Sequence, residues 1–246
     1  MTEYAGQGEA KRTLELLWGK AAPARRGPNQ RTSVDEIVAT AIAIADRDGI
    51  AGVTMRAVGR DLDRTAMSLY TYVPGREELI TLMYDRAHAE LKTSSTKDWR
   101  KAATKWSVEL RDLYVRHPWL LEVSQARPAF GPHEQDVLES LLRILARAEL
   151  AIEHRPSVTS ALYGIVREAA KQKLMGVVSE QDRAWWAERA KVLQEVAPDF
   201  ADRFPESTAI AQHQAKTGPD PWRQAAEEAF SGAVSLVLDG VGLRSK

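Results

Sequence analysis

Between residues 65 and 73 the chain carries hydroxyl groups at a spacing that a short helix brings to one face. If Leu69 and Val73 face a core, the outward residues are Thr65, Met67, Ser68, Thr71 and Tyr72, with Tyr70 at the border. Hydroxyl groups can bond to phosphates or base edges, and methyl-bearing side chains can contact thymine. No acidic side chain interrupts this face. The pattern is typical of a helix that contacts DNA, but packing aromatics in a solvated rim would also produce it.

Three short helices must position this face. After Thr32, apolar residues recur at helical spacing, and Ser33 with Glu36 forms a capping box that starts the first helix, which Gly49 ends. Thr54 can cap a second helix and Thr65 a third, with a turn of about three residues between them. The inward residues that we expect are Ile37, Val38, Ala41, Ile42, Ala45, Met55, Val58, Leu62, Leu69 and Val73. This order indicates a helix-turn-helix unit, although many three-helix units share the spacing.

Further helices follow, separated by proline, glycine and small polar residues. One opens after Pro74-Gly75 and runs through Leu91, and the polar stretch 93–96 is a plausible domain boundary. Helices over 99–117, 132–147, 156–176 and 222–241, with two or three short helices between 179 and 221, complete an all-α chain. We expect a basic flexible extension over 1–31, a helix-turn-helix DNA-binding domain over 32–92, and a ligand-binding and dimerisation domain over 93–246.

The run TMRAVGRDLDRTAMSLYTYVPGREELI resembles the DNA-binding signature of the tetracycline-repressor (TetR) family, in which Leu-Tyr-x-His/Tyr-Phe/Val precedes a short turn. The likeness covers about residues 33–91. The second domain of drug-sensing members is more loosely similar to two further segments of this chain, HPWLLEVSQARPAFGPHEQDVLESLLRIL and FSGAVSLVLDGV. The resemblance implies an all-helical homodimer that represses transcription until a small molecule binds the second domain. The tetracycline-binding histidine and asparagine pattern has no counterpart here, so we expect neither tetracycline nor magnesium.

The resemblance also implies which side chains contact DNA. Two residues of the turn depart from the family pattern, since Asp63 and Arg64 stand where Gly and then Val or Ile are usual. Asp tolerates the left-handed backbone conformation, and Arg64 can add a DNA contact. Guanidinium groups at helix starts suit phosphates. The expected contacts are Thr54, Arg56, Arg64, Thr65, Ala66, Met67, Ser68, Tyr70, Thr71, Tyr72 and Arg76.

A basic segment without acids precedes the first helix of this unit. It carries Lys20, Arg25, Arg26 and Arg31, and its prolines and glycine oppose a helix. We interpret it as a flexible arm in which Arg25 and Arg26 follow phosphates or enter the minor groove, with a solvated linker as the alternative. The stretch from Thr13 to Trp18 could dock on a partner or on the body of the protein.

Aromatic residues are frequent beyond residue 98, in a region without catalytic groups. We expect an apolar cavity between helices there, with polar contacts from Gln125, Arg167 and Glu168. Its apolar lining is expected to be drawn from Trp106, Leu110, Tyr114, Trp119, Phe130, Tyr163 and Met175. The expected effector is a small apolar, ring-containing molecule. Small residues on the last helix and the helix over 156–176 predict a four-helix interface between two copies.

Composition excludes several other classes. The chain has no cysteine, and its 34 basic and 34 acidic residues cancel, so a disulfide framework and a global attraction to DNA or membranes are excluded. The sequence contains no membrane span, no secretory signal, no phosphate-binding loop and no histidine spacing typical of a metal site. We therefore expect a cytoplasmic protein that is not an enzyme and needs no cofactor. The competing hypothesis is a helical ligand-binding or protein-interaction module that lacks DNA binding.

Overall fold

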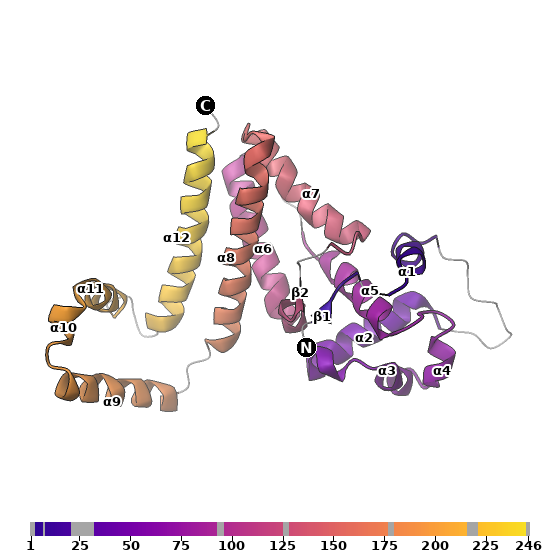
Figure 1. Ribbon diagram of the computed structural model, residues 1–246, viewed down its shortest axis with the longest axis horizontal. Helices are drawn as coiled ribbons and strands as arrows, with labels where there is room; N and C mark the ends of the chain where they lie inside the picture. Colours follow the sequence, from indigo (N-terminus) through magenta and orange to yellow (C-terminus); the bar gives the residue numbers. More distant parts are fainter. Residues whose placement is uncertain are drawn as a thin grey trace.

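The computed structural model describes residues 3–6, 8–20, 32–92, 96–124, 128–176, 180–215 and 221–244, and in these ranges the chain is almost entirely helical (Figure 1). The expectation of an all-α chain is thereby confirmed. None of the helices described is long and apolar enough to cross a membrane.

A compact head is built from the segments α2 (Val34–Asp48), η1 (Ile50–Gly52), α3 (Met55–Asp61), α4 (Ala66–Leu69) and α5 (Arg76–His88). Side-chain caps start three of these helices as expected, because Ser33, Thr54 and Thr65 each accept a hydrogen bond from a backbone N–H three residues on. The expected inward residues are buried except Ile42 and Leu62, which are half-buried, and Ile44 takes the remaining core position on α2. α5 ends three residues earlier than expected, before a turn that still buries Leu91.

The rest of the chain forms a helical bundle and a lateral arm (Figure 1). The bundle comprises α6 (Trp99–Arg116), η2 (Pro118–Leu121), α7 (Pro132–Arg147), η3 (Ile152–His154), α8 (Arg155–Met175) and α12 (Pro221–Arg244). α8 lies between α6 and α12, and α7 packs on both α6 and the head helix α5. The arm comprises α9 (Glu180–Val196), α10 (Phe200–Arg203) and α11 (Pro205–Gln214), of which α9 is longer than expected.

The N-terminal segment departs most from the sequence prediction. Residues 3–20 are not a flexible extension, because β1 (Glu3–Tyr4) pairs in parallel with β2 (Val123–Ser124) and α1 (Ala10–Leu17) packs on α5. The stretch from Thr13 to Trp18 therefore docks on the body of the protein. Strands of two residues carry no periodicity, and for this reason the sequence did not reveal them. The basic arm over 21–31 lies outside the described residues.

Candidate nucleic-acid interface and ligand cleft

The turn between α3 and α4 is held by a close backbone contact. The amide of Arg64 donates to the carbonyl oxygen of Gly59 at 2.7 Å, and Asp63 adopts a left-handed backbone with φ of 54°. A Cβ added to Gly59 would lie 2.7 Å from the carbonyl oxygen of Arg64. Only glycine fits this position without displacing backbone, so Gly59 sets how closely α4 approaches α3.

The face predicted to contact DNA is largely exposed. Met67 is 75% exposed and Tyr70 46% exposed, whereas Ser68 and Ala66 are half-buried. The Ser68 hydroxyl donates to the carbonyl oxygen of Thr65, and the Thr71 hydroxyl donates to that of Ser68, each at 2.7 Å. These two hydroxyl oxygens can still accept hydrogen bonds from a ligand.

Thr54 and Thr65 lie on the same part of the head and are both exposed. Their hydroxyl oxygens accept the helix caps of α3 and α4, which leaves each hydroxyl proton able to donate. Arg56 is exposed and has no ion-pair partner among the residues that the structure describes. The surface thus offers two hydroxyl donors and one guanidinium group, which suits phosphate oxygens.

Two expected DNA contacts, Tyr72 and Arg76, are turned inward in the structure, whereas Arg64 stays at the surface. Tyr72 is half-buried and packs against the core, because the chain turns after α4 and brings its ring inward. Arg76 donates from Nε to the carbonyl oxygen of Val53 and from Nη2 to that of Ile50, so its guanidinium braces the head internally. Arg64 is exposed, and its Nε donates to the Thr32 hydroxyl at 3.3 Å.

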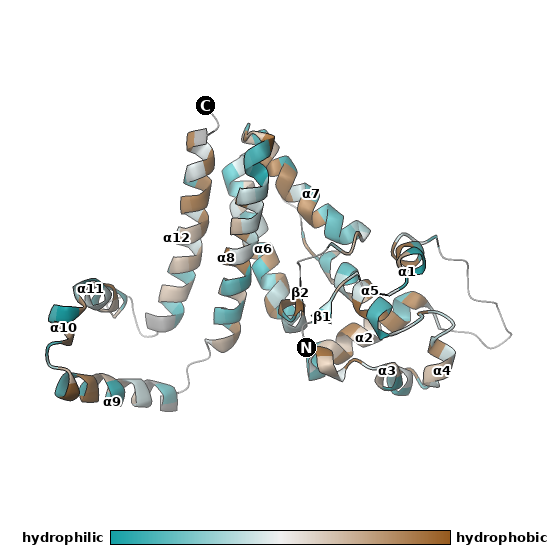
Figure 2. Cartoon of the chain, in the orientation of Figure 1, coloured by the Kyte–Doolittle hydropathy of each residue, from teal (hydrophilic) through white to brown (hydrophobic). Residues whose placement is uncertain are grey.

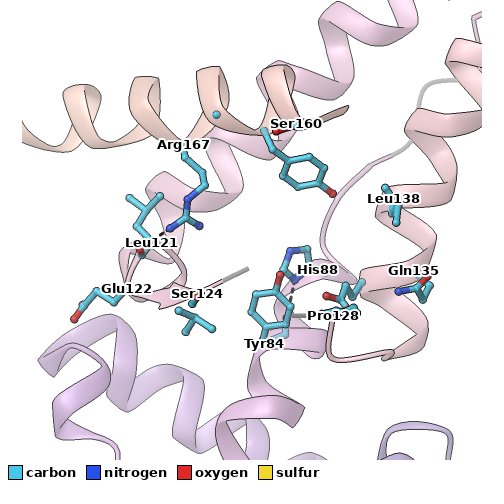
Figure 3. A pocket seen from close by; sticks show the side chains of 14 residues that line it. Tyr84, His88, Leu121, Glu122, Ser124, Pro128, Gln135, Leu138, Ser160 and Arg167 are labelled. Atoms are coloured by element: carbon cyan, nitrogen blue, oxygen red, sulfur yellow. Dashed lines mark hydrogen bonds between the residues drawn. The ribbon is translucent and has the colours of Figure 1, made fainter. Parts of the chain in front are cut away.

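A cleft of about 630 Å³ opens where the head meets the bundle (Figure 3). Its walls come from α5, residues 121–124, Pro128, α7 and α8. Its lining residues are Tyr84, His88, Leu121, Glu122, Val123, Ser124, Pro128, Glu134, Gln135, Leu138, Ser160, Tyr163, Gly164 and Arg167. The volume is that of a small-molecule site. Since α5 carries Tyr84 and His88, the last helix of the head is also a wall of the cleft.

Of the residues predicted to line a ligand cavity, Tyr163 and Arg167 lie on this cleft, whereas most of the others do not. Four expected lining residues belong to the packed core, namely Trp106, Leu110, Tyr114 and Trp119. Phe130 and Met175 are exposed and do not line this cleft, Glu168 is exposed on α8, and Gln125 lies outside the described residues. Helical periodicity shows that an aromatic residue faces inward, but it does not distinguish a core position from a cavity wall.

Arg167 and His88 are fixed polar groups of the cleft. Arg167 Nη2 donates to the carbonyl oxygen of Leu121 at 2.6 Å, which holds the guanidinium at the cleft wall (Figure 3). His88 Nδ1 lies 2.7 Å from the carbonyl oxygen of Tyr84, so the neutral ring carries its proton on Nδ1 and Nε2 is an acceptor. Burial lowers the pKa of His88 to about 4, and this ring is therefore uncharged at neutral pH.

Two acidic residues join α5 to the start of α7. Asp85 Oδ1 accepts from the amides of His133 and Glu134, both at 2.9 Å, and so caps α7 from a different helix. Burial raises the pKa of Asp85 and also that of Glu134. Glu134 Oε1 accepts from the amide of Ala129 at 3.3 Å. Asp85 therefore ties the N-terminal end of α7 to α5.

A second polar junction joins α2 to the segment after α6. Asp46 Oδ1 accepts from Trp119 Nε1 at 2.9 Å and lies 2.7 Å from His117 Nδ1. His117 Nε2 lies 3.2 Å from Glu90 Oε1, so the ring bridges two acids of the head. Trp119, expected at the ligand site, instead anchors the head to the bundle. In the described part of the chain no group of three or more His, Asp or Glu side chains could hold a metal ion.

Comparison with known proteins agrees with this architecture. A family model described as the tetracyclin repressor-like C-terminal domain matches residues 93–244. The HTH-type transcriptional repressor DrrR1 of Streptomyces coeruleorubidus is 33% identical over 248 residues, which cover 98% of this chain and 88% of that protein.

Solved structures share the fold at lower identity. The Streptomyces coelicolor TetR family protein ActR in complex with actinorhodin has a TM-score of 0.68 at 23% identity and covers 86% of this chain and 95% of its own. Mycobacterium smegmatis BioQ, solved with its double-stranded DNA operator, has a TM-score of 0.55 at 18% identity and covers 86% of this chain and 99% of its own.

Proposed function

This chain belongs to the tetracycline-repressor family of helix-turn-helix transcriptional regulators, and on that premise we propose that it represses transcription by binding a pseudo-palindromic operator as a homodimer, which a small molecule releases. One observation carries the ligand response. The helix α5, which closes the head, also presents Tyr84 and His88 to the cleft, so a bound molecule contacts the DNA-binding head directly. We propose no catalytic role, no cofactor and no membrane partner, and a site of action in the cytoplasm.

For DNA binding we propose contacts from the exposed face of α3 and α4. Arg56, Thr54 and Thr65 bind phosphates, while Met67 and Tyr70 reach into the major groove, with Ala66, Ser68, Thr71 and Arg64 beside them. Tyr72 and Arg76 support this face from within the head. Arg25 and Arg26 remain a proposed minor-groove or phosphate arm.

The cleft suggests an effector with an apolar ring body and polar substituents. Leu121, Leu138 and Tyr163 offer apolar surface, whereas Gln135 and Arg167 offer hydrogen-bond donors on the facing walls (Figure 3). This adds polar substituents to the small apolar, ring-containing molecule expected from the sequence. Because binding is linked, an effector that weakens operator binding by some factor binds the operator complex more weakly by the same factor.

The outer side of α12 supports a homodimer. An exposed stripe of small and apolar residues follows the helix, and it comprises Ala229, Gly232, Leu236, Gly240 and Leu243. Leu236 is 73% exposed and Leu243 is 79% exposed, and Figure 2 shows α12 as neutral or hydrophobic over most of its length. Phe230, Val234 and Val241, on the opposite side of the same helix, face the core of their own subunit. The outward stripe, together with α8, is the proposed two-fold interface.

The test begins with an operator selected from random DNA duplexes and measures binding by fluorescence anisotropy over a range of salt. Arg56→Ala is expected to weaken binding and to reduce the salt slope by about 1 per subunit. Arg143→Ala is the matched control, because this arginine is also exposed but lies on α7.

Two results would reject the proposal. If folded protein selects no duplex, the chain is a ligand-binding or protein-interaction module without DNA binding. If Arg56→Ala and Arg143→Ala lower the salt slope equally, the exposed face of α3 and α4 is not the DNA-binding surface.

A further inference from the structure

We propose that residues 3–6 and 8–18 form an N-terminal strap that relays occupancy of the cleft to the helix-turn-helix unit, with the Glu3–Arg76 ion pair as its essential link. The proposal rests on the proposed function and adds a regulatory connection to it. The strap touches three places: the wall of the cleft, the start of α5, and the loop 128–131 (Figure 1).

At the cleft, the strap backs two lining residues. Glu3 pairs with Val123 and Tyr4 pairs with Ser124 in the parallel ladder, and both Val123 and Ser124 line the cleft. Ala5 is buried directly after this ladder. A ligand that displaces residues 123 and 124 must therefore either move β1 or break its pairing.

Beyond the ladder, the strap is bonded to α5 and to the loop before α7. The amide of Gly6 donates to the Thr81 hydroxyl at 3.0 Å, and the amide of Glu9 donates to Glu78 Oε1 at 3.1 Å. Trp18 Nε1 donates to the carbonyl oxygen of Phe130 at 3.0 Å. These bonds fix the strap across the junction between the head and the bundle.

The link to the DNA-binding face runs through Arg76. Its Nη1 lies 2.7 Å from Glu3 Oε1, while its Nε and Nη2 hold the carbonyl oxygens of Val53 and Ile50 at 2.8 and 2.9 Å. Val53 immediately precedes Thr54, the N-cap of α3, and Ile50 begins η1 just before it. One half-buried guanidinium thus joins the strap to the start of the helix-turn-helix unit.

The same guanidinium can be held in two ways. With β1 paired, Glu3 neutralises Arg76 and fixes its direction, so the backbone before α3 is braced. With β1 displaced, Arg76 loses its only carboxylate partner among the described residues and turns toward water. The first arrangement favours the geometry that binds DNA, and occupancy of the cleft favours the second.

The absence of cysteine allows the cleft to be filled without knowing the effector. Ser160→Cys introduces a single thiol at the cleft wall, and N-(1-pyrenyl)maleimide attached there serves as a tethered occupant. Ser157→Cys carries the same label one turn earlier on α8, outside the cleft lining. Operator affinity is measured with and without the label in three backgrounds, which are the parent chain, Glu3→Gln and Glu9→Gln.

In the parent chain, we expect the label attached at Ser160→Cys to weaken operator binding about tenfold or more. The same label attached at Ser157→Cys should have little effect on operator binding. In the Glu3→Gln background the weakening should fall below about threefold, because the link to Arg76 has lost its charge. Glu9→Gln is the matched control, since it removes an exposed carboxylate from the same strap while the bond to Glu78 uses only its backbone amide. Equal weakening in the Glu3→Gln and parent backgrounds would overturn the relay.

A second readout separates failure of the relay from failure of DNA binding. Hydrogen exchange at the amides of residues 53–58 is expected to accelerate when Ser160→Cys is labelled, and this acceleration should be lost with Glu3→Gln. If no operator is selected, the proposed function fails while this measurement still decides the relay. If exchange is unchanged by the label, or changes equally in both backgrounds, the strap does not couple the two sites.

Discussion

Adding a single methyl group at Gly59 tests the geometry of the helix-turn-helix turn. In the Gly59→Ala variant, the new Cβ would lie 2.7 Å from the carbonyl oxygen of Arg64 and 3.2 Å from the amide nitrogen of Ala66. Ordinary van der Waals contact begins at 3.4 Å. Both neighbours are backbone atoms at the start of α4, so they cannot rotate away as a flexible side chain would.

Two opposing effects set the size of the change. Replacing glycine by alanine inside a helix stabilises the folded state by about 1 kcal/mol. Forcing an extra methyl group against packed atoms costs about 1–3 kcal/mol, and a contact with backbone belongs at the upper end of that range. We therefore expect the free energy of unfolding to fall by about 1–2 kcal/mol, and operator affinity to fall about tenfold because α4 is displaced from α3.

Denaturant unfolding at one fixed protein concentration, followed by anisotropy with the selected operator, measures both effects. Gly164→Ala is the matched control: this helical glycine has no neighbour within 4 Å of an added Cβ, so the variant should gain up to about 1 kcal/mol. If Gly59→Ala is as stable as the parent chain and binds the operator equally well, the close approach of α3 and α4 does not hold.

Three further outcomes are expected, two from the structure and one from the basic segment of the sequence. Leu236→Asp should dissociate the homodimer in analytical ultracentrifugation. Met67→Asp changes a residue of similar exposure and should stay dimeric but lose operator binding. If the Leu236→Asp variant remains dimeric, the α12 interface is rejected. Because the folded-state pKa of His88 is about 4, below its ordinary value of 6.5, the contribution of His88 to the free energy of unfolding should fall as pH drops from 6.5 to 4, by up to about 1.4 kcal/mol per pH unit. Denaturant titrations of the parent chain and His88→Asn should therefore differ by this slope. Arg25→Ala with Arg26→Ala should reduce the salt slope of operator binding by about 2 per subunit, and an unchanged slope would make the segment a linker.

The sequence predicted the head well because local signals define it. Three hydroxyl caps and one residue in the left-handed conformation, Asp63, mark its helix boundaries, and each of these depends on neighbours within a few residues. With Leu69 and Val73 placed in the core, the sequence predicted Met67 outward and Tyr70 at the border, and both side chains are exposed. Gly59 was missed, because the need for glycine there arises from the following helix and not from its own.

The cleft and the strap were predicted poorly because both depend on contacts between distant residues. The strongest aromatic signals, Trp106 and Trp119, belong to core residues whose indole N–H groups bond to the carbonyl oxygen of Val137 and to Asp46. Tyr84 and His88, on a helix assigned to the DNA-binding domain, line the cleft instead. Their spacing of four residues places them on one face of α5, but only the position of α7 and α8 makes that face a wall.

Two physical connections consequently run between the cleft and the DNA-binding face. The direct connection is α5 itself. Its Asp85 side chain caps α7, and its Tyr84 lines the cleft. The second passes from β2 through Glu3 to Arg76 and reaches the chain just before α3. Because α5 begins at Arg76, both connections converge on one residue. Removing the Glu3 charge should therefore reduce the response to an occupied cleft without abolishing it, whereas replacing Arg76 should impair both the response and the fold of the head.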